Sequence, residues 1–227
     1  MASTAPLQSV AAPSENVGRT TREEWIDLAR DILISDGVSS VKVMNLAQRL
    51  NVSRSSFYWF FKSRRDLLDQ LLHHWEHTNT ASIVEHAGRP AHTITEGVLS
   101  LFECWIGETK FDPRLDFAIR EWARRSPDVH KQVDAADTAR IQAIAAMFRR
   151  HGYDEGEAFI RARVLYFMQV GYYALEVREP LDVRLSYTEA YIRSFTGKDP
   201  TVTELNRFRS TVRKLTADAR EPVSTVW

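Results

Sequence analysis

Apolar residues recur along this chain three and four positions apart, which is the spacing of one face of an α-helix. The first such run follows residues 20–24, Thr-Thr-Arg-Glu-Glu, where two overlapping capping boxes can start a helix. The run ends before Gly37, a residue that accommodates a left-handed helix C-terminus. A helix is therefore predicted between about residues 21 and 36. Its apolar face is formed by Trp25, Leu28, Ala29, Ile32 and Leu33.

The same spacing continues toward the C-terminus, where proline and glycine separate successive helical segments. No alternating run of apolar and polar residues is long enough to indicate a strand, and no internal repeat is found. The predicted fold class is therefore all-α. The helical segments expected beyond residue 62 are 63–75, 98–106, 113–122, 126–151, 155–178, 182–196 and 200–215.

Residues 43–61, VMNLAQRLNVSRSSFYWFF, have the pattern of a helix-turn-helix. A short first helix carries the small Ala47, which lets a second helix cross closely. Asn51 tolerates the left-handed backbone of a tight turn, and Ser53 is an N-cap for the next helix. The first turn of that helix presents short and cationic side chains, whereas Phe57 and a second phenylalanine four positions later point back at the core. Such a motif places the N-terminal end of its second helix in the DNA major groove.

Charge is distributed unevenly along the chain. The net charge is zero, with 30 basic and 30 acidic residues, and taken alone this argues weakly against nucleic-acid binding. Residues 37–65, however, contain six basic and no acidic residues, so the remainder carries a net charge of minus six. A local basic region is what contact with phosphate requires. The six residues are Lys42, Arg49, Arg54, Lys62, Arg64 and Arg65.

With these features, the segment from Thr21 to about Trp75 resembles the DNA-binding domain of the TetR family. The run from Phe57 to Leu68, FYWFFKSRRDLL, matches that family's signature of an aromatic recognition helix, a short basic link and a following helix ending in leucines. The resemblance places Tyr58 and Lys62 at positions that commonly contact the DNA backbone and bases. It also implies a three-helix N-terminal domain followed by a helical domain that binds a small molecule and forms a dimer.

Two positions depart from the family pattern. Lys42 stands where Ser or Thr usually caps the first motif helix and touches phosphate. Either Ser40 caps this helix instead, or the helix starts without a cap. Phe60 stands where His is common, which removes a polar contact. Phe60 either changes the operator sequence that is recognised or packs inward.

The candidate DNA contacts fall into two groups. Short, cationic and aromatic side chains on the second motif helix are candidates for base edges and phosphates, unless this helix is an ordinary exposed one with its aromatic residues in the core. Basic residues nearby are candidates for phosphate, unless they form a solvated run of charge. The first group is Arg54, Ser55, Ser56, Tyr58 and Trp59, and the second is Lys42, Lys62, Arg64 and Arg65.

The resemblance implies that residues 155–178 and 182–196 form the dimer as a four-helix bundle. Residues 155–178 carry two separable apolar stripes. One of them includes a mid-helix glycine, which costs about 1 kcal/mol relative to alanine and suggests the close approach of a partner helix. The predicted dimer face is Ile160, Val164, Phe167, Met168, Gly171 and Leu175.

The second stripe, with aromatic residues of two preceding segments, suits an effector pocket, because apolar rings are mixed with hydroxyl and amide groups. Each of these residues is also compatible with a plain core. Arg120 either binds an anionic ligand or pairs internally with a carboxylate such as Asp137. The candidate pocket residues are Phe102, Trp105, Phe117, Arg120, Trp122, Tyr166, Gln169 and Tyr173.

Other chemistry finds little support. No GxSxG, P-loop, Rossmann glycine pattern or HExxH motif occurs, so neither catalysis nor a cofactor is expected. His73 and His77 lie four positions apart without a third ligand at a suitable spacing, so no metal site is expected. Cys104, the one cysteine, is either a small core residue or a redox-sensing thiol. Neither a signal peptide nor a membrane span is recognisable, and a cytoplasmic location without a membrane partner is expected.

The sequence thus predicts a disordered arm over residues 1–19, a helix-turn-helix DNA-binding domain over 20–66, and a ligand-binding and dimerisation domain over 67–227. We expect a repressor that binds a palindromic operator in double-stranded DNA as a homodimer and is released by a small-molecule effector. An activator, a repressor relieved by a partner protein, and a helical adaptor or ligand-binding protein that has lost DNA binding remain as alternatives.

Overall fold

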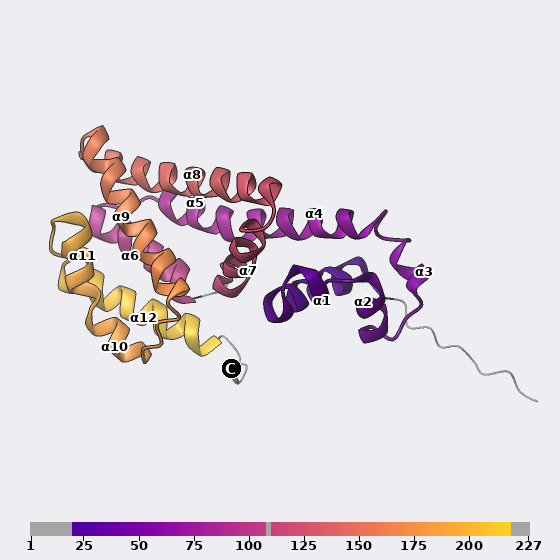
Figure 1. Cartoon of the computed structure of the whole chain (residues 1–227). Helices are drawn as coiled ribbons and strands as arrows, with labels where there is room; N and C mark the ends of the chain where they lie inside the picture. Colours follow the sequence, from indigo (N-terminus) through magenta and orange to yellow (C-terminus); the bar gives the residue numbers. More distant parts are fainter. Residues whose placement is uncertain (1–19, 108–109, 219–227) are drawn as a thin grey trace, which may run out of the picture.

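The computed structural model describes residues 20–107 and 110–218. Within these residues every regular element is helical and no strand occurs, which confirms the predicted all-α fold. The N-terminal helices form a small unit at one end of the molecule, and the longer helices pack together at the other (Figure 1). The predicted arm over residues 1–19 lies outside the described residues. None of the described helices combines the length and apolarity needed to cross a membrane.

The N-terminal unit is built from short helices joined by tight turns. Helix α1 begins with a capping box, as the sequence predicted: the Thr21 hydroxyl accepts from the backbone N–H of Glu24, and the Glu24 carboxylate accepts from the backbone N–H of Thr21. Gly37, with φ of 76°, ends it. The elements are α1 (Arg22–Asp36), the 3-10 turn η1 (Val38–Ser40), α2 (Val43–Arg49), α3 (Arg54–Phe57) and α4 (Arg64–Trp75).

Helices α2 and α3 form the predicted helix-turn-helix. Asn51 makes the turn in the left-handed conformation, with φ of 54°. Lys42 is the N-cap residue of α2 and gives no side-chain cap bond. The Ser40 hydroxyl donates instead to the carbonyl of Asp36, at 3.1 Å. Of the two predicted possibilities, the uncapped start of α2 is therefore the one observed.

Aromatic packing holds α3 on α1. The rings of Trp25 and Phe57 meet edge to face with their centroids 5.3 Å apart, and Phe57 stacks on Phe61 at 5.1 Å. All three side chains are buried, which confirms the inward direction predicted for the two phenylalanines. Phe60 is partly buried against the same cluster. Since this side of α3 is held inside, its other side faces solvent.

The C-terminal part is a stack of longer helices. A π-helical turn, η2 (Glu76–Thr80), joins α4 to α5, so these two helices form one long rod (Figure 1). The segment predicted as one helix over residues 182–196 is divided between α10 and α11. The elements are α5 (Ala81–Gly88), α6 (Ile94–Gly107), α7 (Pro113–Ala123), α8 (Pro127–Arg150), α9 (Glu155–Ala174), α10 (Leu181–Ser186), α11 (Thr188–Thr196) and α12 (Val202–Asp218).

The buried apolar side chains form two clusters. One cluster, here called the N-terminal core, joins α1 to α4 with Leu115, Ile119 and Ala123 of α7 and with the first turns of α8. The other joins α5, α6 and α9 to α12 around the second half of α8. Helix α7 therefore contributes to the N-terminal core although it follows residue 66 by almost fifty positions. Helix α8 contributes buried side chains to both clusters.

The left-handed turn at Asn51 makes a prediction about stability. Replacing Asn51 by alanine is expected to lower the free energy of unfolding by about 1 kcal/mol, because a Cβ atom without a compensating polar group disfavours this conformation. Asn51→Gly is expected to match or exceed the wild type, since glycine adopts it freely. Urea unfolding followed by circular dichroism measures both. Equal stability of the two variants would contradict the assigned turn.

Candidate nucleic-acid interface and effector cavity

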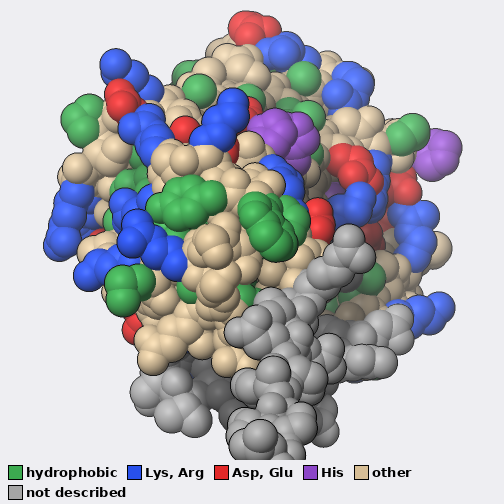
Figure 2. Space-filling model, turned by 90° about the vertical axis from the view of Figure 1, so that its right-hand side faces the viewer, with side chains coloured by type: hydrophobic (Ala, Val, Ile, Leu, Met, Phe, Trp, Pro, Cys, Tyr) green, Lys and Arg blue, Asp and Glu red, His purple; other side chains and the backbone are tan. Residues whose placement is uncertain are grey.

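The outward side of α3 and the turn after it presents Arg54, Ser55, Tyr58 and Trp59, all exposed. Trp59 is 80% exposed and Tyr58 49%, although large aromatic side chains are usually covered. The Arg54 guanidinium lies 5.9 Å from the centre of the Tyr58 ring and donates to its hydroxyl at 3.2 Å. Figure 2 faces this end of the molecule, where Lys and Arg side chains gather beside exposed hydrophobic ones. Positive charge and flat apolar surface therefore lie together.

Two of the predicted DNA contacts bond within the protein: Ser56 is buried, whereas Arg64 is exposed and donates to backbone carbonyls. Ser56 is buried and its hydroxyl lies 3.0 Å from that of Ser53, so it fixes the start of α3 and does not present itself to a base edge. Arg64 donates from Nε to the carbonyl of Val41 and from Nη2 to that of Val38, both at 2.5 Å. This arginine ties the turn before α2 to the first turn of α4. The predictions for Ser56 and Arg64 are corrected accordingly.

The remaining basic candidates differ in whether a carboxylate already pairs with them. Lys42 and Lys62 are exposed, and no carboxylate of the described residues forms an ion pair with either. Arg65 is shared between Asp69, at 3.0 Å, and Asp128, at 3.9 Å. The two lysines are therefore better placed than Arg65 to meet phosphate.

One exposed residue of this surface was not predicted. Met44, in the first turn of α2, is 73% exposed. Its signal in the sequence is weak: it lies off the apolar face that Val43 and Leu46 define, where a polar residue is usual. Its exposure adds an apolar contact point next to Lys42.

Two adjoining cavities lie among the C-terminal helices. The first cavity lies between α6, α9 and α11, and the second between α6, α7 and α9. Each encloses a free volume of about 50 Å³, and the space between atoms with the open mouths included is about 470 and 420 Å³. Predicted pocket residues that line the first are Phe102, Trp105 and Gln169. Those that line the second are Trp105, Phe117, Arg120, Tyr166, Gln169 and Tyr173.

Trp122 is the predicted pocket residue that the cavities exclude. It lies on α7 but packs, partly buried, against the N-terminal core. Phe117 and Arg120, on the same helix, line the second cavity. Helix α7 therefore has one face toward the cavity and another toward helices α1 to α4. The prediction for Trp122 is wrong because helical spacing does not say which neighbour a given face meets.

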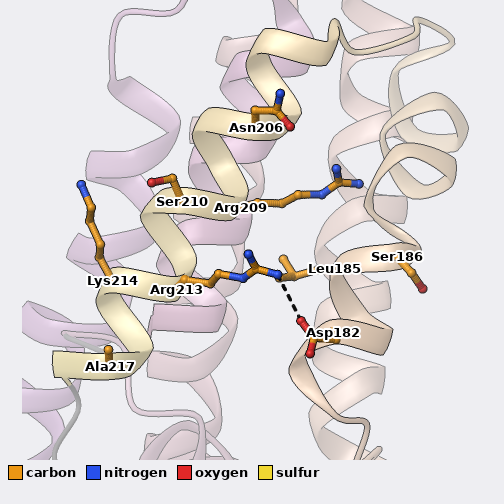
Figure 3. A pocket seen from close by; sticks show the side chains of 9 residues that line it. All are labelled: Asp182, Leu185, Ser186, Asn206, Arg209, Ser210, Arg213, Lys214 and Ala217. Carbon is orange, nitrogen blue, oxygen red and sulfur yellow. Dashed lines mark hydrogen bonds and ion pairs between the residues drawn. The ribbon is translucent and has the colours of Figure 1, made fainter.

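A wider and shallower hollow lies between α10 and α12 (Figure 3). Its lining is mostly polar and includes Arg209, Arg213 and Lys214. Asp182 accepts from Arg213 at 3.4 Å across it. Because water fills an open, charged hollow of this kind, it is less suited to an apolar molecule than the aromatic cavities are.

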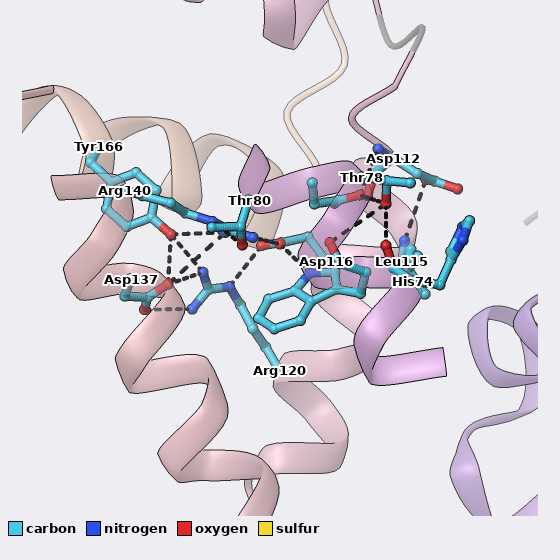
Figure 4. A network of polar contacts seen from close by, with 12 residues as sticks. His74, Thr78, Thr80, Asp112, Leu115, Asp116, Arg120, Asp137, Arg140 and Tyr166 are labelled. Carbon is cyan, nitrogen blue, oxygen red and sulfur yellow. Dashed lines mark hydrogen bonds and ion pairs between the residues drawn. The ribbon is translucent and has the colours of Figure 1, made fainter. Parts of the chain in front are cut away.

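A buried polar network forms one wall of the second cavity (Figure 4). Its centre is Asp116 of α7, which accepts from Arg140 Nη2 of α8 at 2.9 Å and from Trp75 Nε1 of α4 at 2.7 Å. Arg120 donates to Asp116 at 3.0 Å and binds both carboxylate oxygens of Asp137, at 2.9 and 2.6 Å. The Arg120–Asp137 pairing confirms the internal alternative that the sequence left open.

Arg140 links this network to two further elements. It donates to the hydroxyl of Thr80 in η2 at 3.1 Å and to that of Tyr166 in α9 at 3.0 Å. Its side chain is 1% exposed. Two arginines and two aspartates balance in charge, so the network carries no net charge. One cluster of hydrogen bonds thereby connects α4, η2, α7, α8 and α9.

The electrostatics of the network follow from this pairing. Burial alone would raise the pKa of Asp116, but the Arg140 and Arg120 guanidinium groups outweigh burial and hold it below its usual range. Burial raises the pKa of the Tyr166 hydroxyl, so Tyr166 stays protonated and donates to Asp137 at 2.6 Å. Asp116, Arg120 and Arg140 thus stay charged near neutral pH.

Asp116 and Arg140 were not singled out from the sequence, although Arg140 left a signal. It falls on the apolar side of α8, in helical register with Val133, Ala136 and Ile144. A charged residue at such a position requires a buried partner. Which residue is the partner could not be deduced, because Asp116 lies 24 positions away on another helix.

The predicted dimer stripe of α9 lies largely on the outside. Ile160 is 58% exposed, Val164 53%, Phe167 45% and Leu175 78%. Gly171 belongs to the same face, and a Cβ atom added there would meet no other atom within 4 Å. Met168 departs from the prediction, because it turns inward and lines the first cavity. The stripe is an apolar helix face that this chain alone leaves in water.

Two further predictions concern His73 with His77, and Cys104. Glu76 brings a carboxylate within 4.8 Å of both imidazoles. The expectation that no third ligand lies near the two histidines is therefore wrong, although all three groups are exposed.

Cys104 is buried, its sulfur lies 3.2 Å from the Ser82 hydroxyl, and burial raises the pKa of its thiol to about 11. A thiol held protonated is a poor redox sensor, so the core interpretation is favoured.

Comparisons with known proteins match this arrangement. Residues 26–71 match the family model described as bacterial regulatory proteins, tetR family. Over 55 residues the chain is 36% identical to the tetracycline repressor protein class D of Escherichia coli, covering 24% of this chain and 25% of that protein. Over 108 residues it is 24% identical to the HTH-type transcriptional regulator AcrR of Shigella flexneri, covering 44% and 49%.

The solved structure of the ketosteroid transcriptional regulator KstR2 of Mycobacterium tuberculosis resembles this chain with a TM-score of 0.58 at 15% identity, covering 82% of this chain and all of that one. At this identity the likeness shows the fold alone. The matched sequence spans between a quarter and about half of the length of the curated relatives above. The sequence likeness is therefore strongest over the helix-turn-helix.

The buried network makes a prediction about stability and its pH dependence. Asp116→Asn is expected to lower the free energy of unfolding by about 3 to 5 kcal/mol near neutral pH, because Arg140 loses its closest counter-charge while still buried. The lowered pKa of Asp116 means that its contribution is present above the unfolded-state pKa, about 4, and is lost as the pH falls through the folded-state value. The stability difference between wild type and variant should therefore narrow below about pH 4.

Asp134→Asn is the matched control. Asp134 lies on α8, is 64% exposed and pairs only with exposed His130, at 3.5 Å, so a loss of less than about 1 kcal/mol is expected. Denaturant unfolding at several pH values measures both variants. Similar losses for Asp116→Asn and Asp134→Asn would show that the network does not stabilise the fold.

Proposed function

Since this chain belongs, through its N-terminal domain, to the tetR family of bacterial regulatory proteins, we propose that it represses transcription by binding an operator as a homodimer, and that a small-molecule effector releases it. The observation that carries this proposal is the outward side of α3. Its aromatic and cationic side chains face solvent because Phe57, on the other side, is locked against Trp25. An exposed recognition helix within a basic region is the form that major-groove recognition takes.

The individual residues support a division of labour on DNA. Arg54 and Ser55 lie in the first turn of α3 and are the proposed readers of base edges, a role that arginine fills by donating to guanine. Lys42 and Lys62 are proposed to bind phosphates on either side of the groove. Trp59 offers a flat surface to the sugar-phosphate backbone. Arg64 is proposed to support DNA binding indirectly, by fixing the turn that precedes α2.

The exposed stripe of α9 supports the proposed dimer. A two-fold symmetric interface uses the same patch on both subunits, and Ile160, Val164 and Phe167 form a continuous apolar row for that purpose. Gly171 would let the two copies of α9 approach closely. The dimer would hold two α3 helices about one DNA turn, or a multiple of it, apart.

The position of α7 supports a route for effector release. Leu115 and Ile119 are buried in the N-terminal core, whereas Phe117 lines the second cavity. A molecule in that cavity would displace α7 and, through the Trp75–Asp116 hydrogen bond, the rod that begins with α4. The spacing of the two α3 helices would change as a result. The effector acts only to the extent that it binds the released state more tightly than the DNA-bound state.

Arg54→Ala tests the recognition helix. We expect it to lower operator affinity by about one to two orders of magnitude, because a bidentate contact to a base contributes about 1–3 kcal/mol of discrimination. The measurement is gel retardation of the DNA upstream of the protein's own gene, over a series of salt concentrations and with unrelated duplex as competitor.

Arg89→Ala is the matched control, because this exposed arginine follows α5 and lies outside the basic region. It is expected to leave DNA binding unchanged. Unaltered binding by Arg54→Ala would show that α3 is not the reading element. If the wild type gives no selective retardation, the proposal itself fails in favour of a helical adaptor that has lost DNA binding.

Val164→Asp tests the dimer face. A charge in the centre of the apolar stripe is expected to convert the dimer to monomer, because it would be buried without a partner in the symmetric interface. Val202→Asp is the control, since Val202 is 74% exposed on α12, away from the stripe. Analytical ultracentrifugation measures the mass of each. A Val164→Asp protein that stays dimeric would move the interface elsewhere.

A further inference from the structure

Two buried polar groups among the C-terminal helices lack a hydrogen-bond partner among the described residues. They are the indole N–H of Trp105 and the amide nitrogen of Gln169. Trp105 is 1% exposed and Gln169 7%. A buried donor without a partner costs about 1–3 kcal/mol, and folded proteins leave few of them. Two such groups close together require an explanation.

Both groups belong to the wall between the two cavities. Trp105 lies on α6 and Gln169 on α9, and these two residues are the ones that the linings of the first and second cavities have in common. The Tyr173 hydroxyl donates to the backbone carbonyl of Trp105 at 2.8 Å and holds this part of α6 against α9. The two residues that carry the unpartnered groups therefore lie where the two cavities adjoin.

The chemistry of these two groups limits what can satisfy them. An indole N–H donates a hydrogen bond and cannot accept one. The Gln169 amide can turn to donate or to accept. A partner for Trp105 must therefore carry an acceptor, such as a carbonyl or ether oxygen, and Gln169 can bind that oxygen or a second polar group beside it.

Charges around the cavities balance without a ligand. In the second cavity Arg120 and Arg140 are already paired with two aspartates. The first cavity is lined by one charge of each sign: the Tyr172 hydroxyl donates to Glu179 at 3.2 Å, and the Arg184 guanidinium lies 5.1 Å from the Tyr172 ring. A carboxylate or ammonium group in the second cavity would be buried without a counter-charge of its own.

The remaining walls are aromatic. Phe102 and Ile106 line the first cavity, and Phe111 stacks on Tyr173 beside the second, with ring centroids 5.9 Å apart. Flat side chains of this kind pack well against a flat or ring-containing molecule.

We propose that the effector of this protein is an uncharged, largely apolar ring compound bearing a carbonyl-type oxygen, and that this oxygen binds the indole N–H of Trp105 with the Gln169 amide beside it. This inference rests on the proposed function, because it names the ligand class of the effector site. It assigns Trp105 and Gln169 as the residues that select an oxygenated ligand over a hydrocarbon of the same shape.

The test compares three probes of one shape: 9-fluorenone, fluorene, and fluorene-9-carboxylate. Equilibrium dialysis, with ligand measured by chromatography, gives affinities that do not depend on tryptophan fluorescence. The wild type is expected to bind fluorenone about five- to tenfold more tightly than fluorene, which is the effect of one net hydrogen bond. Fluorene-9-carboxylate is expected to bind more weakly than fluorenone.

Trp105→Phe keeps an aromatic ring and removes the donor. It is expected to weaken fluorenone binding by about five- to tenfold and to change fluorene binding by less than about twofold. Gln169→Met is the second variant, with a smaller loss for fluorenone. Trp25→Phe is the matched control, because Trp25 also has a buried, unpartnered indole N–H but lies in the N-terminal core, so neither probe should lose affinity.

Several outcomes would overturn the inference: no binding of fluorenone, equal wild-type affinities for ketone and hydrocarbon, preference for the carboxylate, or equal losses in Trp105→Phe and Trp25→Phe. Thermal unfolding of each variant shows that it is folded. Gel retardation of the same preparations, without any of the three ligands, distinguishes failure of the proposed ligand class from failure of the proposed function. Selective DNA binding with no preference for the ketone refutes only the ligand class, whereas absent DNA binding refutes the proposed function.

Discussion

The ion pair between Asp116 and Arg140 is the interaction on which the arrangement of the C-terminal helices depends. It joins α7 to α8, and each partner binds a further element: Asp116 binds Trp75 at the end of α4, and Arg140 binds Thr80 in η2 and Tyr166 in α9. Separating the two charges would leave both in an apolar interior, at a cost of about 3–5 kcal/mol. The helices that meet at this pair are therefore constrained to move together.

This constraint gives α7 its importance. Its apolar residues complete the N-terminal core, and its polar and aromatic residues line the second cavity. Protein interiors are close-packed, so a change on one side of α7 is transmitted to the other. The π-helical turn η2 adds a second connection, since Asn79 is fully buried and its amide both donates to the Asp112 carbonyl, at 2.7 Å, and accepts from the Asp112 N–H, at 3.2 Å, at the start of α7. The N-terminal helices and the second cavity are thus joined through α7 and η2.

The surfaces proposed to meet DNA, effector and partner subunit lie on different faces. The DNA surface is the outer side of α3, the dimer surface is the outer side of α9, and the cavities lie on the inner sides of α6, α7 and α9. Helix α9 is the link between the last two, since Phe167 faces outward while the neighbouring Tyr166 and Met168 face inward. A ligand between α6 and α9 would therefore press on the helix that supports the dimer.

Features that depend on residues close together in the chain could be predicted from the sequence alone. The capping box at Thr21, the left-handed Asn51, the helical periodicities and the basic region over residues 37–65 depend on residues close together in the chain, and they led to the all-α fold and the helix-turn-helix. The exposed stripe of α9 was also foreseeable, because one helix face is set by spacing. Tertiary structure alone decided the partners: Arg64 donates to the Val41 carbonyl, Trp122 packs against the N-terminal core, and Asp116 pairs with Arg140. Arg64 and Val41 are 23 positions apart in the sequence, and Asp116 and Arg140 are 24. The spacing of residues along one helix carries no information about which other helix it will contact.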